Sequence, residues 1–150
     1  MPQPPDLHVR RPIRRITALE AAFLLWSLAL IPITLRRARR MPLPALVRAY
    51  DAAPRISVPP TSVDRFAQLL NGLFRRIRVR DYCMPASLIL FRWVRRCGQP
   101  ASIVFGVARK EDDLHGHAWV ELDGRALGES TDPRNSFQVT FSYPDEGRAG

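Results

Sequence analysis

Two residues, Cys83 and His117, have the types and the spacing that a cysteine acyl-transfer site requires. Cys83 stands where a helix is expected to begin, and His117 opens a strand-like HAWVE run thirty-four positions later. The first turn of a helix presents unpaired N–H groups and the positive end of the helix dipole, which both favour thiolate over thiol. A histidine on a neighbouring strand can take the thiol proton and return it to a leaving group. The pair therefore predicts nucleophilic catalysis.

Glu129 is the carboxylate best placed to assist His117. The dipeptide Asp123-Gly124 has the composition of a two-residue hairpin turn. Folding the chain about this turn sets His117 opposite residue 130, so Glu129 becomes a close diagonal neighbour on the next strand. A carboxylate in that position can orient the imidazole and stabilise its charged form.

Other residues compete for these roles. His115 lies at the junction between an acidic loop and the strand, Asp123 has a sufficient explanation in the turn, and Asp132 has the setting of a loop residue. A strand histidine is more often structural than catalytic. A lone cysteine is commonly a small buried apolar residue, which is how we interpret Cys97. A helix-start cysteine followed by a histidine and an acid favours the catalytic interpretation.

Length, composition and charge limit the class of protein. The 150 residues fit one domain, and an apolar fraction of 46% is ordinary for a globular chain. The two cysteines lack the spacing of a zinc site or a disulfide scaffold, which indicates a reducing cytoplasm. The three histidines form no ligand cluster, so we expect neither a metal nor a cofactor.

The positive charge is concentrated in the first two thirds of the chain. Residues 1–100 hold 18 basic and 5 acidic side chains, and residues 101–150 hold 5 and 9, for a net charge of +9. No helix-turn-helix, zinc finger or aromatic-interleaved basic strand accompanies this charge, so we expect no nucleic-acid partner. An acidic partner or an anionic membrane surface fits equally well.

Residues 1–60 are expected to form a loose arm, an apolar helix and a linker. Thr17 and Glu20 have the spacing of a capping box. The helix that they open is expected to run from Ala21 to about Leu30 and to end or kink at Pro32.

The role of this apolar segment stays open. The run from Ala21 to Leu35 has fifteen residues, fewer than the roughly 20 that a bilayer core requires. Docking to the domain or to a partner protein, peripheral membrane contact through residues 18–35, and a true span are the alternatives. A short helix near 45–52 and a surface linker over 52–60 are expected to follow.

Residues 61–145 are expected to form the functional core. A helix capped by Ser62 has apolar residues at helical spacing over 63–77. A second, more apolar helix runs from Cys83 to Cys97, and Gly98 supplies its left-handed stop.

Strands are expected over 101–107, 116–122, 125–130 and 136–143. Helices followed by an antiparallel sheet indicate an α+β fold. On the second strand His117 is expected to lie on the face that looks at the buried helix, and so to reach the cysteine.

Several of these residues together resemble the lasso-peptide leader peptidases, small bacterial proteins with a transglutaminase-like, papain-like cysteine protease core. The likeness spans about residues 62–143. The residues that carry it are Tyr82-Cys83, Gly98, Phe105-Gly106-Val107, His117-Ala118-Trp119-Val120-Glu121, Gly124 and Glu129. The resemblance implies that Cys83 is the nucleophile and His117 the base. Glu129 stands where the family often has aspartate. Glutamate keeps the negative charge but has a longer side chain.

The resemblance also implies a function. A protease of this kind removes the leader from a ribosomally made precursor peptide through a thioester acyl-enzyme. The first sixty residues have no strand-rich domain to grip the leader, so the chain is similar to the stand-alone proteases. Its expected partners are the precursor peptide, a separate leader-binding recognition-element protein and an ATP-dependent lasso cyclase, all in the cytoplasm.

Two other functions remain open. A transglutaminase-like acyl transferase has the same fold but uses an amine instead of water as the acceptor. A non-catalytic scaffold would bind a partner or a membrane through its basic helical half, and its Cys83 would have no role.

Overall fold

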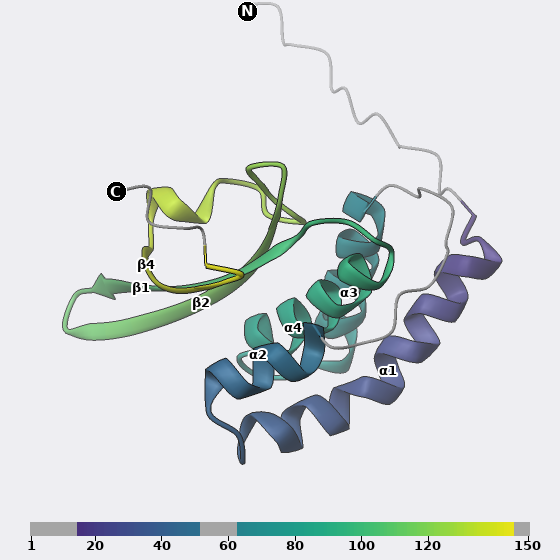
Figure 1. Cartoon of the computed structure of the whole chain (residues 1–150), viewed down its shortest axis with the longest axis horizontal. Coiled ribbons are helices and arrows are strands. Elements are labelled where there is room, and N and C mark those ends of the chain that lie inside the picture. Colours follow the sequence, from purple (N-terminus) through teal and green to yellow (C-terminus); the bar gives the residue numbers. More distant parts are fainter. Residues whose placement is uncertain (1–14, 52–62, 146–150) are drawn as a thin grey trace, which may run out of the picture.

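Four helices precede a four-stranded antiparallel sheet, and this arrangement confirms the expected α+β class (Figure 1). The computed structural model describes residues 15–51 and 63–145. The expected N-terminal arm, the linker over 52–60 and the helix cap at Ser62 lie outside the described residues.

Helix α1 (Ala18–Ala38) is longer than the sequence indicated. Its capping box is confirmed, because the N–H of Thr17 donates to Glu20 Oε2 (2.9 Å) and the N–H of Glu20 donates to Thr17 Oγ1 (3.2 Å). The expected end at Pro32 is wrong. This exposed proline removes one helical hydrogen bond, but Thr34 beyond it is buried and helps to hold the helix on the domain. At 21 residues, α1 is long and apolar enough to cross a membrane by length and composition.

The other three helices agree with the sequence pattern. They are α2 (Leu43–Asp51), α3 (Val63–Ile77) and α4 (Cys83–Arg96). Nine of the fourteen residues of α4 are buried, as a central helix requires. Gly98, with a φ of 81°, provides the expected left-handed stop.

One hydrophobic core includes residues of all four helices and of the sheet. The ring of Phe23 from α1 lies 4.9 Å from the ring of Phe66 in α3 and 4.9 Å from that of Trp93 in α4, measured between centroids. All three side chains are buried. Aromatic residues contribute large buried areas, so α1 is an integral part of the core.

The sheet has the order β3-β2-β1-β4, formed by β1 (Ser102–Lys110), β2 (Asp113–Leu122), β3 (Arg125–Ala126) and β4 (Gln138–Tyr143). The hairpin turn is confirmed, because Asp123 and Gly124 both have positive φ (51° and 74°), as a type I′ turn requires. The first two strands extend into the acidic segment that the sequence assigned to a loop. The third strand is much shorter than expected, which changes how Glu129 is held.

Candidate active site

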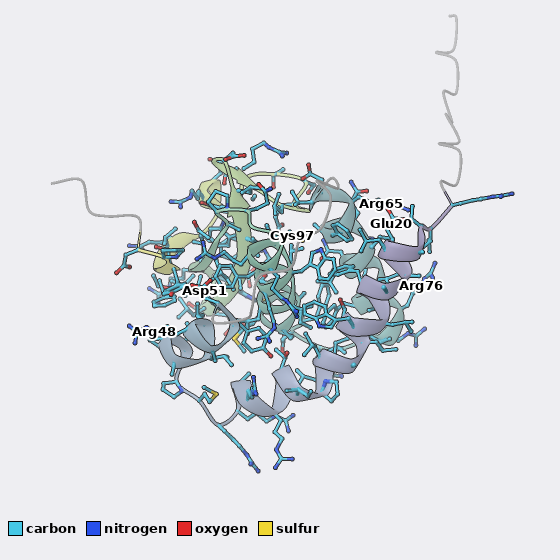
Figure 2. All side chains as sticks on the ribbon, turned by 45° about the vertical axis from the view of Figure 1, so that its right-hand side comes forward. Glu20, Arg48, Asp51, Arg65, Arg76 and Cys97 are labelled. Carbon is cyan, nitrogen blue, oxygen red and sulfur yellow. The ribbon has the colours of Figure 1, made fainter. Side chains whose placement is uncertain are left out.

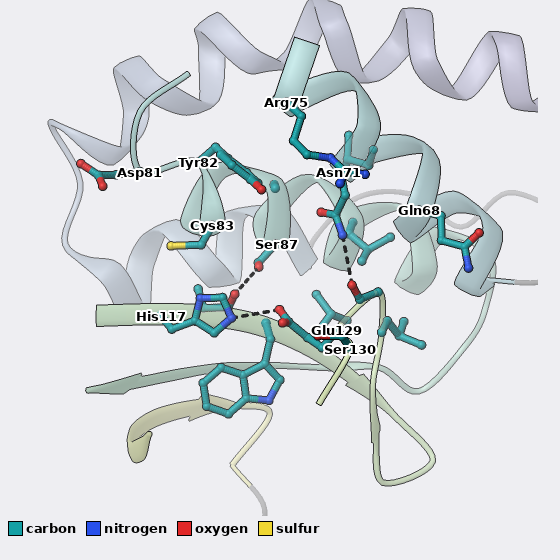
Figure 3. A pocket seen from close by; sticks show the side chains of 18 residues that line it. Gln68, Asn71, Arg75, Asp81, Tyr82, Cys83, Ser87, His117, Glu129 and Ser130 are labelled. Atoms are coloured by element: carbon teal, nitrogen blue, oxygen red, sulfur yellow. Dashed lines mark hydrogen bonds and ion pairs between the residues drawn. The ribbon is translucent and has the colours of Figure 1, made fainter. Parts of the chain in front are cut away.

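Cys83 is the first residue of α4, as the sequence predicted, and it lines a cavity (Figure 3). Its side chain is partly buried. Pro85 in the first turn leaves the helix intact, because N–H groups there have no partner within the helix. Those N–H groups and the helix dipole create a positive potential beside the sulfur. The local structure therefore favours the thiolate.

His117 reaches Cys83 from an edge of β2. Strand β3 pairs with β2 only at Glu121 and Leu122, so among the described residues no strand covers this edge beside His117. The imidazole and the Cys83 side chain line the same cavity, and their interaction shifts the pKa values of both groups. A thiol and an imidazole thus lie side by side, an arrangement that general-base activation of a thiol would require.

The face of β2 that packs on α4 is not the one expected. Val120 and Leu122 belong to the core that contains the α4 side chains. Trp119 packs on Phe137 instead, with ring centroids 6.5 Å apart. Because side chains alternate across a strand, His117 shares the face of Trp119 and not the helix-packed face. The expectation was wrong because the more apolar face of β2 takes the core position, and His117 contacts Cys83 from the strand edge.

Glu129 contacts His117 from a loop. Its Oε1 lies 2.9 Å from Nε2 of His117, as the dashed line in Figure 3 marks. The sequence placed Glu129 on a strand, and this is wrong because β3 ends at Ala126. Gly128 has a φ of 71°, which a residue with a side chain rarely adopts, and its carbonyl accepts a hydrogen bond from Asn71 Nδ2 (3.3 Å). This turn fixes Glu129 beside the imidazole.

The charges of the pair are coupled. Burial has the largest single effect on Cys83 and opposes ionisation, but the hydrogen bond from His117, backbone amides and the imidazolium charge together lower the pKa of Cys83. The hydrogen bond to Cys83, followed by that to Glu129, raises the pKa of His117 to about 9. Both shifts favour the thiolate and imidazolium over the neutral thiol and imidazole.

The competing residues lie away from this contact. His115 is exposed on β2, and Asp123 occupies the hairpin turn. Asp132 accepts a hydrogen bond from the N–H of Arg134 (2.9 Å) and caps the short helix Pro133–Asn135. Cys97 follows the opposite end of α4, and burial raises its pKa.

The sequence predicted only part of the group of residues that supports the imidazole. The ring of His117 stacks on Trp119 at 5.8 Å and lies 5.1 Å from the ring of Phe137. Trp119 Nε1 donates to Glu121 Oε1 (2.8 Å), and Arg134 donates to both oxygens of Glu121 (2.7 and 3.0 Å). The alternation of β2 placed the tryptophan and the glutamate beside the histidine. No local signal placed Arg134 or Phe137.

The site opens into a cavity of about 650 Å³ between α3, α4 and β2 (Figure 3). Segment 127–130 lines it beside the histidine, and α3 contributes the polar side chains of Gln68, Asn71 and Arg75. Its volume falls within the range of ligand pockets, which leaves room for residues on either side of a peptide bond at Cys83. Across residues 15–51 and 63–145, no group of three or more His, Cys, Asp or Glu side chains is placed to hold a metal ion.

The comparisons with known proteins agree with this fold. Residues 17–142 match the family model of the transglutaminase-like superfamily, which is most of the chain and includes α1. The comparisons with curated proteins and with solved structures gave no match. Members of this superfamily are commonly cysteine peptidases or acyltransferases. The chain belongs to the transglutaminase-like superfamily.

Proposed function

We propose that this protein is a cysteine peptidase that removes the leader from a ribosomally synthesised lasso-peptide precursor. The observation that carries the proposal is that Cys83 at the start of α4 and His117 on β2 line one cavity, where their interaction lowers the thiol pKa and raises the imidazole pKa. The superfamily supports a peptidase or an acyltransferase. The resemblance of the motifs around both residues to leader peptidases supports the choice of substrate.

Acylation starts from the thiolate of Cys83 and the imidazolium of His117. The Cys83 thiolate attacks the carbonyl carbon of the last leader residue, and a C–S bond forms. The backbone N–H of Cys83, at the helix start, can donate to the resulting oxyanion; loss of one such donor typically costs about 3 kcal/mol. The C–N bond then breaks as the His117 imidazolium donates its proton to the departing amine of the core peptide. A thioester and a neutral imidazole remain.

Deacylation restores the enzyme. The neutral His117 takes a proton from water, and the hydroxyl group adds to the thioester carbonyl. The C–S bond breaks, which returns the Cys83 thiolate and releases the leader as a carboxylic acid. Glu129, at 2.9 Å from Nε2, stabilises the imidazolium that forms again. No step requires an electron acceptor or another co-reactant.

We further propose two partners for this reaction. A separate small leader-binding protein presents the precursor, and an ATP-dependent cyclase takes the core peptide and closes its macrolactam ring. The resemblance to the stand-alone leader peptidases supports the assignment of leader binding and ring closure to separate proteins.

Mass spectrometry of a precursor digest tests the proposal. A lasso-precursor peptide is incubated with its leader-binding protein and the purified chain. We expect two fragments whose masses sum to that of the precursor plus one water. Cys83→Ala should abolish them, whereas Cys97→Ala, at the other end of α4, should not. An uncleaved precursor, or equal cleavage by Cys83→Ala, would refute the proposal.

Acyl transfer is the alternative that the superfamily supports. The same digest with added primary amine separates the two reactions. Hydrolysis releases the leader as a free acid even in the presence of the amine. If the leader appears mainly as the amide of that amine, the protein is an acyltransferase and the peptidase assignment is wrong.

A further inference from the structure

Helix α1 buries polar groups beside apolar ones and leaves part of its apolar surface facing outward. Glu20, Ser27 and Thr34 are buried against the domain, while Leu25 and Leu28 are 69% and 47% exposed. A surface helix of a globular protein normally has polar residues on its outward face. The outward face of α1 therefore has the character of a contact surface.

The exposed apolar residues of α1 form one continuous stripe, which we call the α1 stripe. All of its members are apolar and recur three or four positions apart on one side of the helix. They are Ala18, Ala21, Ala22, Leu25, Leu28, Ala29, Pro32 and Ile33. The stripe is roughly 20 Å long. Contiguous exposed apolar surface of this kind marks an interaction site.

The charges around the α1 stripe are positive. Exposed arginines follow it at 36–37 and 39–40, and the exposed Arg15 precedes it. Between residues 15 and 40 the single acidic residue is Glu20, which is buried and paired with Arg65 at 3.2 Å (Figure 2). The outward side of this segment thus presents apolar and cationic groups. An anionic lipid surface offers their complements, since acyl chains accept leucine and lipid phosphates accept guanidinium groups.

We propose that the α1 stripe lies in the plane of an anionic membrane while α1 remains docked on the domain. Crossing the bilayer would remove Phe23 from its contacts with Phe66 and Trp93, and would break the ion pair between Glu20 and Arg65. These contacts hold the helix at the surface. Figure 1 shows α1 on the side of the helical layer away from the sheet, so the contact leaves the cavity at Cys83 open.

Vesicle binding by the purified full chain tests this contact. Co-sedimentation is measured with vesicles of phosphatidylcholine alone and with vesicles that also contain phosphatidylglycerol. We expect binding to the anionic vesicles that weakens with added salt, and at least tenfold weaker binding to the neutral ones. The double variant Leu25→Glu, Leu28→Glu should reduce binding to the anionic vesicles at least tenfold. Both positions are exposed, so the fold should be retained, as circular dichroism can verify.

A matched control lies on the other side of the molecule. Leu114 in β2 is 71% exposed, close to the 69% of Leu25, so Leu114→Glu adds one of the double variant's two negative charges at a similar exposure. This variant should bind the anionic vesicles as the unmodified chain does. The proposal is overturned if the unmodified chain does not bind them, or if Leu114→Glu weakens binding as much as the double variant. It is also overturned if the double variant instead dissociates a dimer of the chain, because a second copy would then cover the stripe.

Discussion

Nε2 of His117 lies 2.9 Å from Oε1 of Glu129, although the histidine is on a strand and the glutamate is on a loop. The other ring nitrogen, Nδ1, is therefore the one that would act on the Cys83 thiol in the proposed reaction. This division lets the carboxylate stabilise the imidazolium while the same ring exchanges a proton with sulfur.

The first prediction concerns the pH dependence of activity. Acylation requires the imidazolium of His117, so activity should fall at alkaline pH as that proton is lost, with a limb near pH 9. Glu129 raises the pKa of His117, so Glu129→Gln should move this limb to lower pH and reduce kcat/KM by about tenfold or more. The apparent pKa of this limb belongs to the coupled Cys–His pair and not to one residue. Glu111→Gln, in the exposed β1–β2 turn, is the control and should leave the profile unchanged.

The second prediction concerns the loop that carries Glu129. A Cβ at Gly128 would lie 2.9 Å from Ala67 Cβ and 3.0 Å from Asn71 Nδ2, at a φ of 71°. Gly128→Ala should therefore displace Glu129 and lower kcat/KM by roughly tenfold to a hundredfold. Gly72→Ala is the matched control, because a Cβ there meets nothing within 4 Å and alanine favours the helix by about 0.5–1 kcal/mol. Equal activity of the two variants would contradict a positioning role for the loop.

The third prediction concerns the ion pair between Arg134 and Glu121, close to the imidazole of His117. Arg134→Gln removes the guanidinium from Glu121, which is only 7% exposed. The free energy of unfolding should fall by about 1–3 kcal/mol, because a buried carboxylate loses its charged partner. Arg125→Gln breaks a similar pair with Asp64, but both of those side chains are exposed, so its cost should stay below about 1 kcal/mol. Urea denaturation of both variants measures the difference.

The fourth prediction concerns the N-terminal helix. Phe23→Ala removes a fully buried ring from the centre of the core and should cost about 3–5 kcal/mol of unfolding free energy. Leu25→Ala, on the exposed side of the same helix, should change that free energy by less than about 0.5 kcal/mol. Similar stabilities of the two variants in urea would mean that α1 is not part of the folding unit.

Local signals were sufficient to predict the framework of the site. The end of α4 follows from the left-handed stop that Gly98 supplies, and Pro85 fits the first turn of the helix, where no N–H is needed. The Asp123-Gly124 turn likewise predicted the pairing of β2 with β3. These features depend on residues within a few positions, which is why the sequence alone could predict them.

Features set by distant contacts were missed. Pro32 normally ends a helix, but packing of α1 against the domain outweighs that preference. The route of the chain after Ala126 depends on the hydrogen bond between Asn71 and Gly128, fifty-seven positions apart. The ion pair of Arg134 with Glu121 likewise joins a short helix to a strand without any periodic pattern.

Alkylation of Cys83 by iodoacetamide across pH tests the paired thiolate most directly. Peptide mapping by mass spectrometry gives the rate at Cys83 and, within the same sample, at the half-buried Cys97. We predict that Cys83 reacts at a lower pH than an ordinary thiol, whose pKa is about 8.5, that Cys97 reacts more slowly, and that His117→Gln moves the Cys83 profile to higher pH. Equal rates at the two cysteines, or a Cys83 profile that His117→Gln leaves unchanged, would contradict the account.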